Sequence, residues 1–326
     1  MKKVTLKDIA NELGVTVGTV SHVLNGINDI SEPTRLRVLE TAERLGYVSN
    51  NAAVSLRSGR TRTVAVIVPD VSNPHIAHQV KLIEERLREA RYSVIILNTG
   101  EDEASEKEAI LTACGKQVDG ILLCPTQKSK RNLRFLEKME IPFLLIGRYY
   151  EDVAWDFVTA DDRRGGYLAG EYLMQAGYRR PLYIGVPPHL VCGQLRLAGA
   201  QEACRAFGAD IPAERIAAID PKGDGVAAAI EDFVQRGVDF DAVIAFSDLI
   251  AFRVTSRLAG LLPDRKIPVV GFDAVNTHLY MPFPHVSVGM VDDGWAKKAV
   301  TALLSKINGE GAPCREQIAV RLYEFA

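Results

Sequence analysis

Apolar runs recur at regular intervals through most of this chain, and their alternation with amphipathic stretches constrains the fold more than any other feature. Each run spans four or five residues, and about 15 residues with helical periodicity separate one run from the next. Unbroken apolar runs of this length are typical of strands buried on both faces of a parallel sheet. The pattern predicts an α/β body of two doubly wound parallel-sheet halves, with strands at 64–68, 93–97, 120–124 and 143–146 in the first half and at 182–186, 216–219, 242–246 and 269–272 in the second.

Such sheets bind their ligands beyond the carboxyl ends of the strands, so two halves that face each other would form one cleft between them. The motifs of a nucleotide-dependent enzyme are missing, because no GxGxxG follows a predicted strand and no GxxxxGK[ST] occurs. We therefore expect a binding protein and no enzyme, with no catalytic residue, no cofactor and no metal site.

The first 48 residues carry helix signals and no strand pattern. Gly14 ends a first helix in the left-handed conformation, and Ser31 with Pro33 opens a third. Three short amphipathic helices are predicted, with apolar positions at Leu6, Ile9, Ala10 and Leu13 in the first, Val17, Val20, Val23 and Leu24 in the second, and Leu36, Leu39, Ala42 and Leu45 in the third.

The tight turn between the first two helices predicts a helix-turn-helix, whose second helix can enter the major groove of DNA. A generic helical hairpin has the same spacing and stays an alternative. Residues 1–62 carry nine Lys/Arg and six Asp/Glu, whereas the remainder carries 30 and 35. A basic head on an acidic body favours a polyanionic partner for the head alone.

Composition and targeting signals indicate a cytoplasmic globular protein. The 326 residues are 47% hydrophobic and 25% charged, which suits a chain with a large core and excludes wholesale disorder. The five cysteines are scattered without a CxxC pair, the start has no signal peptide, and no apolar run approaches the roughly 20 residues that span a bilayer.

Several motifs in a fixed order make the chain resemble the LacI/GalR family of bacterial transcription regulators. They are TLKDIA at 5–10, TVSHVLN at 19–25, LGY at 45–47, SLRSGRT at 55–61, IVPDVSNP at 67–74, VDGIL at 118–122 and VGFD at 270–273. The resemblance implies a helix-turn-helix head at 1–48, a hinge helix and linker at 49–62, and a periplasmic-binding-protein-like body at 63–326. Within the body, the N-terminal half takes about 63–161 plus 291–318, and the C-terminal half about 162–290.

The resemblance also implies which residues bind DNA. Val17 suits a thymine methyl group, and His22 can donate a hydrogen bond to guanine O6 or N7, although a solvated surface histidine is the alternative. Leu56 corresponds to a leucine that wedges into the minor groove, although it could be an ordinary linker residue. The implied set is Val17, Gly18 and His22 for base edges, Thr5, Thr16, Thr19, Ser21, Asn25 and Ser31 for phosphates, and Asn51, Ala53 and Leu56 in the hinge.

An effector is implied in the cleft of the body. Arg148, Arg196 and Asp273 would bind adjacent hydroxyl groups, and either arginine could instead form a structural salt bridge. The implied contacts are Ser72, Asn73, His75 and Arg148 from the first half and Arg196, Phe246, Ser247, Asp248 and Asp273 from the second, with Phe246, Trp155 or Trp295 as the apolar surface for a ring.

Three departures from the family pattern leave the identity of the effector undetermined. Ser247 and Met290 stand where the family usually has Asn and Gln, and His75-Ile76 replaces a common aromatic pair. We predict a homodimeric repressor that binds a pseudo-palindromic operator and responds to a small sugar or sugar acid. The alternative is a corepressor-dependent regulator that senses a nucleobase or another metabolite. A secreted sugar-binding protein would lack the helix-turn-helix head, and no membrane partner is expected.

Overall fold

The computed structural model describes residues 4–24, 27, 29–47, 59–220, 224–277, 279 and 285–325. The chain divides into two compact units, Met1–Thr61 and Arg62–Ala326, which we call the head and the body. Among the described residues, no helix is both long and apolar enough to cross a membrane.

The head holds the three predicted helices, α1 (Leu6–Leu13), α2 (Val17–Leu24) and α3 (Glu32–Arg44). The apolar pattern of α3 was predicted wrongly in part, because Leu36 and Leu39 are 49% and 37% exposed while Val38 takes the inward position. Val38 and Ala42 lie one helical turn apart and therefore share the buried face. The core of the head consists of Ile9, Ala10, Val20, Val23, Val38 and Ala42.

Local caps set the ends of these helices. Gly14 ends α1 with φ of 66°, as predicted, and the Thr5 and Asp8 side chains form a capping box at the start of α1. Ser31 occupies the N-cap of α3, but its side chain bonds no backbone N–H of the helix. The Ser31 hydroxyl instead donates to the hydroxyl of Thr34 at 3.0 Å.

The first half of the body is a six-stranded parallel sheet in the order β11-β5-β4-β3-β1-β2. Alternate residues of its central strands pack against α5 and α12 on one face and against α6 and α7 on the other. The strands are β1 (Thr63–Val68), β2 (Ser93–Asn98), β3 (Gly120–Leu123), β4 (Phe143–Ile146), β5 (Phe157–Ala160) and β11 (Arg315–Ile318), and the helices are α5 (Pro74–Glu89), α6 (Glu103–Gly115), α7 (Arg131–Lys138) and α12 (Gly294–Ile307).

The second half repeats this architecture with the strand order β12-β10-β9-β8-β6-β7, in which β12 runs antiparallel to β10. Helices α8 and α9 cover one face of its sheet, and α10 and α11 cover the other. The strands are β6 (Pro181–Gly185), β7 (Ile216–Ala218), β8 (Ala242–Ala245), β9 (Val269–Phe272), β10 (His285–Met290) and β12 (Val320–Phe325), and the helices are α8 (Asp162–Gln175), α9 (Val191–Ala206), α10 (Gly225–Gln235) and α11 (Asp248–Leu261).

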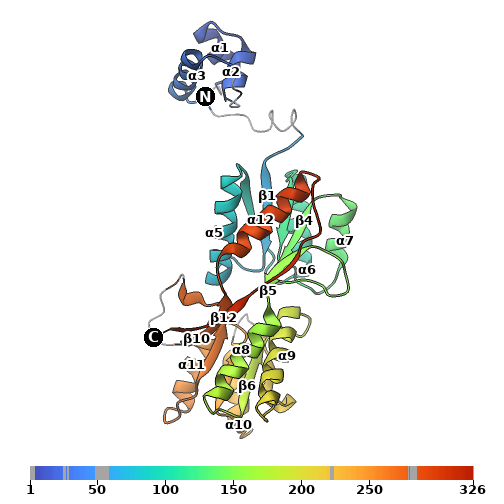
Figure 1. Ribbon diagram of the computed structural model, residues 1–326, viewed down its shortest axis with the longest axis vertical. Helices are drawn as coiled ribbons and strands as arrows, with labels where there is room; N and C mark the ends of the chain where they lie inside the picture. The colour runs from blue at the N-terminus through green and yellow to red at the C-terminus, as the bar shows by residue number, and fades with distance from the viewer. Residues whose placement is uncertain are drawn as a thin grey trace. The chain divides into compact units, whose positions relative to one another are not determined.

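Three chain crossings join the two halves of the body, after β5, after β10 and between β11 and β12. Figure 1 shows β5 and β12 near the junction between the halves. Backbone hydrogen bonds hold the crossings together, from Asp161 N–H to the Ile318 carbonyl at 2.9 Å and from Val291 N–H to the Ala319 carbonyl at 3.1 Å. The predicted boundaries of the two halves leave out residues 319–326. In the structure, residues 320–325 of this stretch form β12 of the second sheet.

Two glycines allow α8 and α9 to pack backbone against backbone. A Cβ atom on Gly166 of α8 would lie 1.9 Å from the carbonyl oxygen of Arg196, and a Cβ atom on Gly199 of α9 would lie 2.0 Å from that of Arg163. No side chain fits in such a gap. The close approach therefore fixes where α9 presents Arg196.

Candidate functional site

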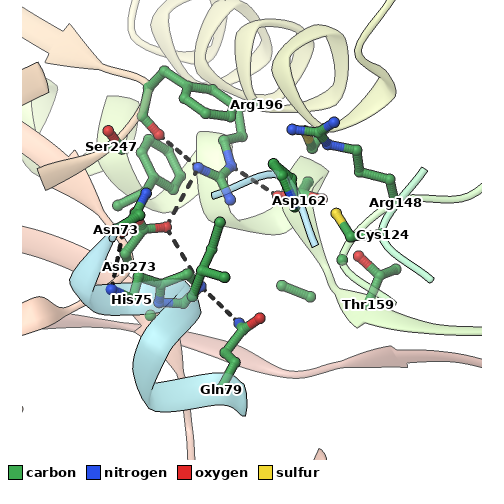
Figure 2. A pocket seen from close by; sticks show the side chains of 18 of the residues that line it. Asn73, His75, Gln79, Cys124, Arg148, Thr159, Asp162, Arg196, Ser247 and Asp273 are labelled. Carbon is green, nitrogen blue, oxygen red and sulfur yellow. Dashed lines mark hydrogen bonds and ion pairs between the residues drawn. The ribbon is translucent and has the colours of Figure 1, made fainter. Parts of the chain in front are cut away.

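A cavity of about 500 Å³ lies between the two halves of the body. Its walls begin where parallel strands end, as the predicted fold requires. Figure 2 shows Arg196 and Asp273 of the second half facing His75 and Gln79 of the first. Of the nine predicted effector residues, eight line this cavity, namely Ser72, Asn73, His75, Arg148, Arg196, Phe246, Ser247 and Asp273.

Arg196 is held in place by hydrogen bonds and by two aromatic rings. Its Nε donates to Asp162 Oδ1 at 2.7 Å, and its Nη1 donates to the carbonyl oxygen of Phe246 at 2.6 Å. The guanidinium also lies between the rings of Phe246 and Phe272, with centroid distances of 4.6 and 4.4 Å. Burial opposes its charge, but the carboxylates of Asp162 and Asp273 outweigh burial and raise the pKa of Arg196.

Asp273 follows β9 in a strained backbone conformation. Its φ is 98° and that of Ala274 is 48°, values that non-glycine residues rarely adopt. The Asp273 N–H donates to the Val288 carbonyl at 2.8 Å, and the Ala274 N–H donates to Ser287 Oγ at 2.9 Å. Such strain persists only where surrounding bonds hold it, so the turn is built to hold the Asp273 carboxylate in the cavity.

Asp248 supports the same turn from behind the cavity wall. It is fully buried, and its Oδ2 accepts a hydrogen bond from the Val275 N–H at 2.8 Å. A Cβ atom on Gly271 would lie 2.2 Å from Asp248 Oδ1, so the glycine leaves the space that this carboxylate occupies. Burial raises the pKa of Asp248. This position corrects the predicted direct contact with the effector, because the side chain of Asp248 is turned toward the backbone of the turn.

Arg148 follows β4 and is paired within its own half. Its Nη1 and Nη2 donate to the two carboxylate oxygens of Glu101 at 2.8 and 2.6 Å, and Nη1 also donates to the Pro125 carbonyl at 3.0 Å. Burial opposes its charge, yet the Cys124 sulfur and the Glu101 carboxylate raise the pKa of Arg148. Glu101 therefore neutralises Arg148 inside the cavity wall.

The start of α5 contributes polar groups from the opposite wall. Asn73 caps this helix, since its Oδ1 accepts a hydrogen bond from the His75 N–H at 3.0 Å. The side-chain nitrogen of Gln79 lies 2.7 Å from His75 Nε2. His75 Nε2 and Arg196 Nη1 each lie 3.9 Å from Asp273 Oδ1, which is beyond hydrogen-bond length. The carboxylate of Asp273 is therefore left available to a ligand.

Acidic groups outnumber basic ones on the cavity wall. Because most of the guanidinium charge is already matched, a bound anion would meet net repulsion. The wall contains the carboxylates of Asp70, Glu101, Asp161, Asp162 and Asp273 and the guanidinium groups of Arg148, Arg196 and Arg253.

The candidates for an apolar ring surface divide into two groups. Phe246 and Trp295 line the cavity as predicted. Trp155 does not, because it packs edge-on against Phe143 and Tyr150 in the core of the first half. Sequence reasoning missed other residues of the wall, including Gln79, Glu101, Cys124, Thr159, Asp162, Cys192 and Phe272.

Gln127 links the two halves outside the cavity wall. Its Oε1 accepts a hydrogen bond from the Val191 N–H at the start of α9 at 3.0 Å, and its Nε2 donates to the Tyr149 carbonyl at 2.7 Å. This bridge joins the first half to the helix that carries Arg196. One side-chain hydrogen bond therefore connects the two halves in addition to the three crossings.

The second candidate site is the exposed face of α2 in the head. Val17, Gly18, Ser21 and His22 have outward positions, whereas Val20 and Val23 are buried. A Cβ atom on Gly18 would meet only Thr16 Oγ1 at 3.5 Å, so nothing within the head requires a glycine there. A glycine at this place allows another molecule to approach the helix backbone closely.

Two of the predicted phosphate-binding residues, Thr16 and Thr5, have local roles at the starts of helices. Thr16 Oγ1 accepts a hydrogen bond from the Thr19 N–H at 3.0 Å and thereby caps α2. The Thr5 hydroxyl donates to Asp8 Oδ2 at 2.7 Å. Both threonines lie at helix starts, where backbone N–H groups attract phosphates. The predicted contacts Asn25, Asn51, Ala53 and Leu56 lie outside the described residues.

Comparison with known proteins gives the class of this molecule. Residues 5–50 match the family of bacterial regulatory proteins, lacI family, and residues 61–261 match the periplasmic binding proteins and sugar binding domain of LacI family. The HTH-type transcriptional regulator CelR of Thermobifida fusca is 31% identical over 321 residues, which cover 95% of this chain and 93% of CelR. The chain therefore belongs to the LacI family and is a DNA-binding transcription regulator with a ligand-binding domain.

Two solved structures agree with the predicted fold. A CelR–cellobiose complex matches with a TM-score of 0.72 and 28% identity over 98% of both chains. The lac repressor dimer bound to operator and an anti-inducer matches with a TM-score of 0.84 and 20% identity, over 99% of this chain and 98% of that one. The predicted helix-turn-helix head and two-half body are confirmed.

Proposed function

We propose that this protein is a repressor, and no enzyme, whose affinity for operator DNA is controlled by a small neutral sugar bound in the cavity of the body. The placement of Asp273 carries this proposal. Its carboxylate projects into the cavity with two basic nitrogens at 3.9 Å, so its oxygens can accept hydrogen bonds from adjacent hydroxyl groups. The relatives that resemble the chain are transcription regulators, which supports a regulatory rather than a catalytic role.

The charges around the cavity favour a neutral ligand over a sugar acid. A ligand carboxylate would need a guanidinium that no carboxylate already matches, whereas two of the three arginines on the wall are paired, Arg148 with Glu101 and Arg196 with Asp162. Hydroxyl groups can use the same surroundings without adding charge, as donors to Asp273 and as acceptors from Arg196. The cellobiose complex of CelR supports a neutral sugar by similarity.

The position of the cavity supports a conformational mechanism. Ligand contacts from both halves favour the arrangement in which His75 and Asp273 approach each other, and a ligand shifts such an equilibrium only by its differential affinity for the two arrangements. The linker at 49–62 leads directly into β1, the first strand of the body. We propose that closure of the halves is transmitted along this segment to the head.

We further propose that two copies act together in the cytoplasm on a pseudo-palindromic operator. A single head of three short helices buries little surface on DNA, whereas two heads on a shared body gain from their effective concentration. The lac repressor dimer on its operator supports this arrangement by similarity of fold.

The exchange Asp273→Asn tests the sugar site directly. A hydrogen bond to a charged acceptor contributes about 1.5–3 kcal/mol, so we expect roughly 10- to 150-fold weaker sugar binding with unchanged operator affinity in the absence of sugar. A thermal-shift screen of cellobiose, glucose, ribose, gluconate, adenine and guanine would identify the ligand class, and titration calorimetry would give its affinity.

Asp239→Asn is the matched control, because this exposed aspartate pairs with Arg180 outside the cavity. Wild-type affinity in Asp273→Asn would contradict the proposed site. A response to gluconate alone would instead favour a sugar acid, and a response to a purine alone would favour the corepressor alternative.

A further inference from the structure

His22 on the exposed face of α2 pairs with a carboxylate outside the helix, and this pair has no part in the proposed function. His22 Nδ1 lies 2.7 Å from Asp29 Oδ2, and Asp29 belongs to the turn between α2 and α3. Both side chains are about half exposed, at 46% and 51%. A surface ion pair of this kind contributes little to stability. It does, however, determine which ring nitrogen of His22 carries a proton.

The chemistry of the contact decides which ring nitrogen carries a proton. An ionised carboxylate only accepts hydrogen bonds, so Nδ1 of His22 has to be the donor in this pair. A neutral imidazole carries one N–H group, and its other nitrogen is then an acceptor. With Nδ1–H directed to Asp29, the Nε2 atom of neutral His22 therefore has a lone pair and no proton.

An acceptor and a donor at Nε2 select different bases. In the major groove, guanine presents N7 and O6, both acceptors, whereas cytosine N4 and adenine N6 are amino donors. The expected hydrogen bond from His22 to guanine is thus open only to the doubly protonated ring. The neutral ring, held by Asp29, requires an amino group.

We propose that Asp29 is a specificity-determining residue of the head, because it holds the Nδ1–H of His22 and so makes Nε2 an acceptor that selects cytosine or adenine in the operator. The proposal rests on the proposed contact between His22 and a base edge. Asp29 itself touches no base in this scheme and acts by positioning the proton of its neighbour.

The proton can be located directly in the full-length protein. Nitrogen-15 correlation spectra of the histidine rings, assigned with His22→Ala, distinguish the two neutral tautomers from the charged ring. We expect the Nδ1–H tautomer in the wild type and the Nε2–H tautomer, which free imidazole side chains favour in water, in Asp29→Ala. Asp29→Asn retains an acceptor oxygen and is expected to restore the Nδ1–H form. An Nε2–H tautomer in the neutral wild type would overturn the proposal.

Base preference is the second measurement. Operator half-sites randomised at each position are selected at a pH where the spectra show the neutral ring. We expect the wild type to prefer cytosine or adenine at one symmetric pair of positions by about tenfold, and Asp29→Ala to shift that preference toward guanine. Asp29→Asn should keep the wild-type preference.

Glu32→Ala provides the matched control, since it removes an exposed carboxylate of the same head that pairs with Arg35 and not with His22. It should leave base preference unchanged. An Asp29→Ala head with wild-type preference would overturn the role of Asp29. If His22→Ala changes no base preference while the tautomers behave as expected, the proposed base contact of His22 fails, and the selectivity assigned to Asp29 fails with it.

Discussion

Replacing Arg196 with alanine is expected to lower the free energy of unfolding by about 3–5 kcal/mol, because it leaves a buried carboxylate without its partner. Asp162 is 4% exposed, and Arg196 Nε donates to it at 2.7 Å. The same exchange removes the guanidinium from between Phe246 and Phe272. Chemical denaturation of the wild type and the variant measures the loss.

The loss should depend on pH in a defined direction. Burial raises the pKa of Asp162 even with Arg196 present, so the folded state holds a proton that the unfolded chain releases near its ordinary pKa of about 3.9. The free energy of unfolding therefore falls as pH rises through the interval between the unfolded and folded values. Without Arg196 the folded pKa is higher still and the interval extends toward neutral pH.

We thus expect the destabilisation by Arg196→Ala to be smaller in mild acid and larger near neutral pH. The double exchange Arg196→Met with Asp162→Asn removes both charges and should recover much of the stability. A loss that is independent of pH, or a double variant as unstable as Arg196→Ala, would show that the ion pair is not the cause.

The second large effect is expected from Gly166→Ala. The new Cβ atom would lie 1.9 Å from the Arg196 carbonyl oxygen, so α8 and α9 have to move apart. Such overpacking typically costs about 1–3 kcal/mol, and here it also displaces the helix that presents Arg196. We expect lower stability together with weaker sugar binding, measured by denaturation and calorimetry.

Gly260→Ala is the control for this exchange. Gly260 lies within α11, and a Cβ atom there has no neighbour within 4 Å. Alanine has higher helix propensity than glycine by about 1 kcal/mol, so this variant should be equally stable or more stable. Equal effects of the two exchanges would rule out the close packing of α8 and α9 as the reason.

The sequence predicts the central strands well because their apolar runs reflect burial on both faces. The expected burial is wrong for 93–97 and 216–219, which form the partly exposed edge strands β2 and β7. It misses β5, β10, β11 and β12, and for β11 and β12 the reason is their position in the sheets. Strand β11 reads Arg-Glu-Gln-Ile and lies at one edge of its sheet, and β12 lies at the edge of the other. An edge strand needs no continuous apolar run, and only its pairing in the folded body makes it a strand.

The positions of cavity residues are easier to predict than their partners. Strand ends together with the family resemblance identify Phe246, the last residue of the predicted strand 242–246, and Asp273, which directly follows the predicted strand 269–272. Asp162 was missed because it follows β5, which has four residues and gave no signal. The pairing of Arg148 with Glu101 joins positions 47 residues apart, and no local pattern encodes such a contact. The charge of the cavity therefore emerges only from the fold.

The control of DNA binding by the cavity is tested most directly by measuring both affinities on the full-length protein. Operator affinity is determined with and without a saturating amount of the sugar that the screen identifies, and sugar affinity is determined with and without operator. Coupling free energies of about 1–3 kcal/mol are typical, and linkage requires both affinities to change by the same factor, roughly 5- to 150-fold. We expect equal factors in the wild type. At a sugar concentration that just saturates the wild type, we expect a clearly smaller change of operator affinity in Asp273→Asn, because its weaker sugar binding leaves most of the variant unliganded. An operator affinity that saturating sugar leaves unchanged in the wild type would contradict the proposed control.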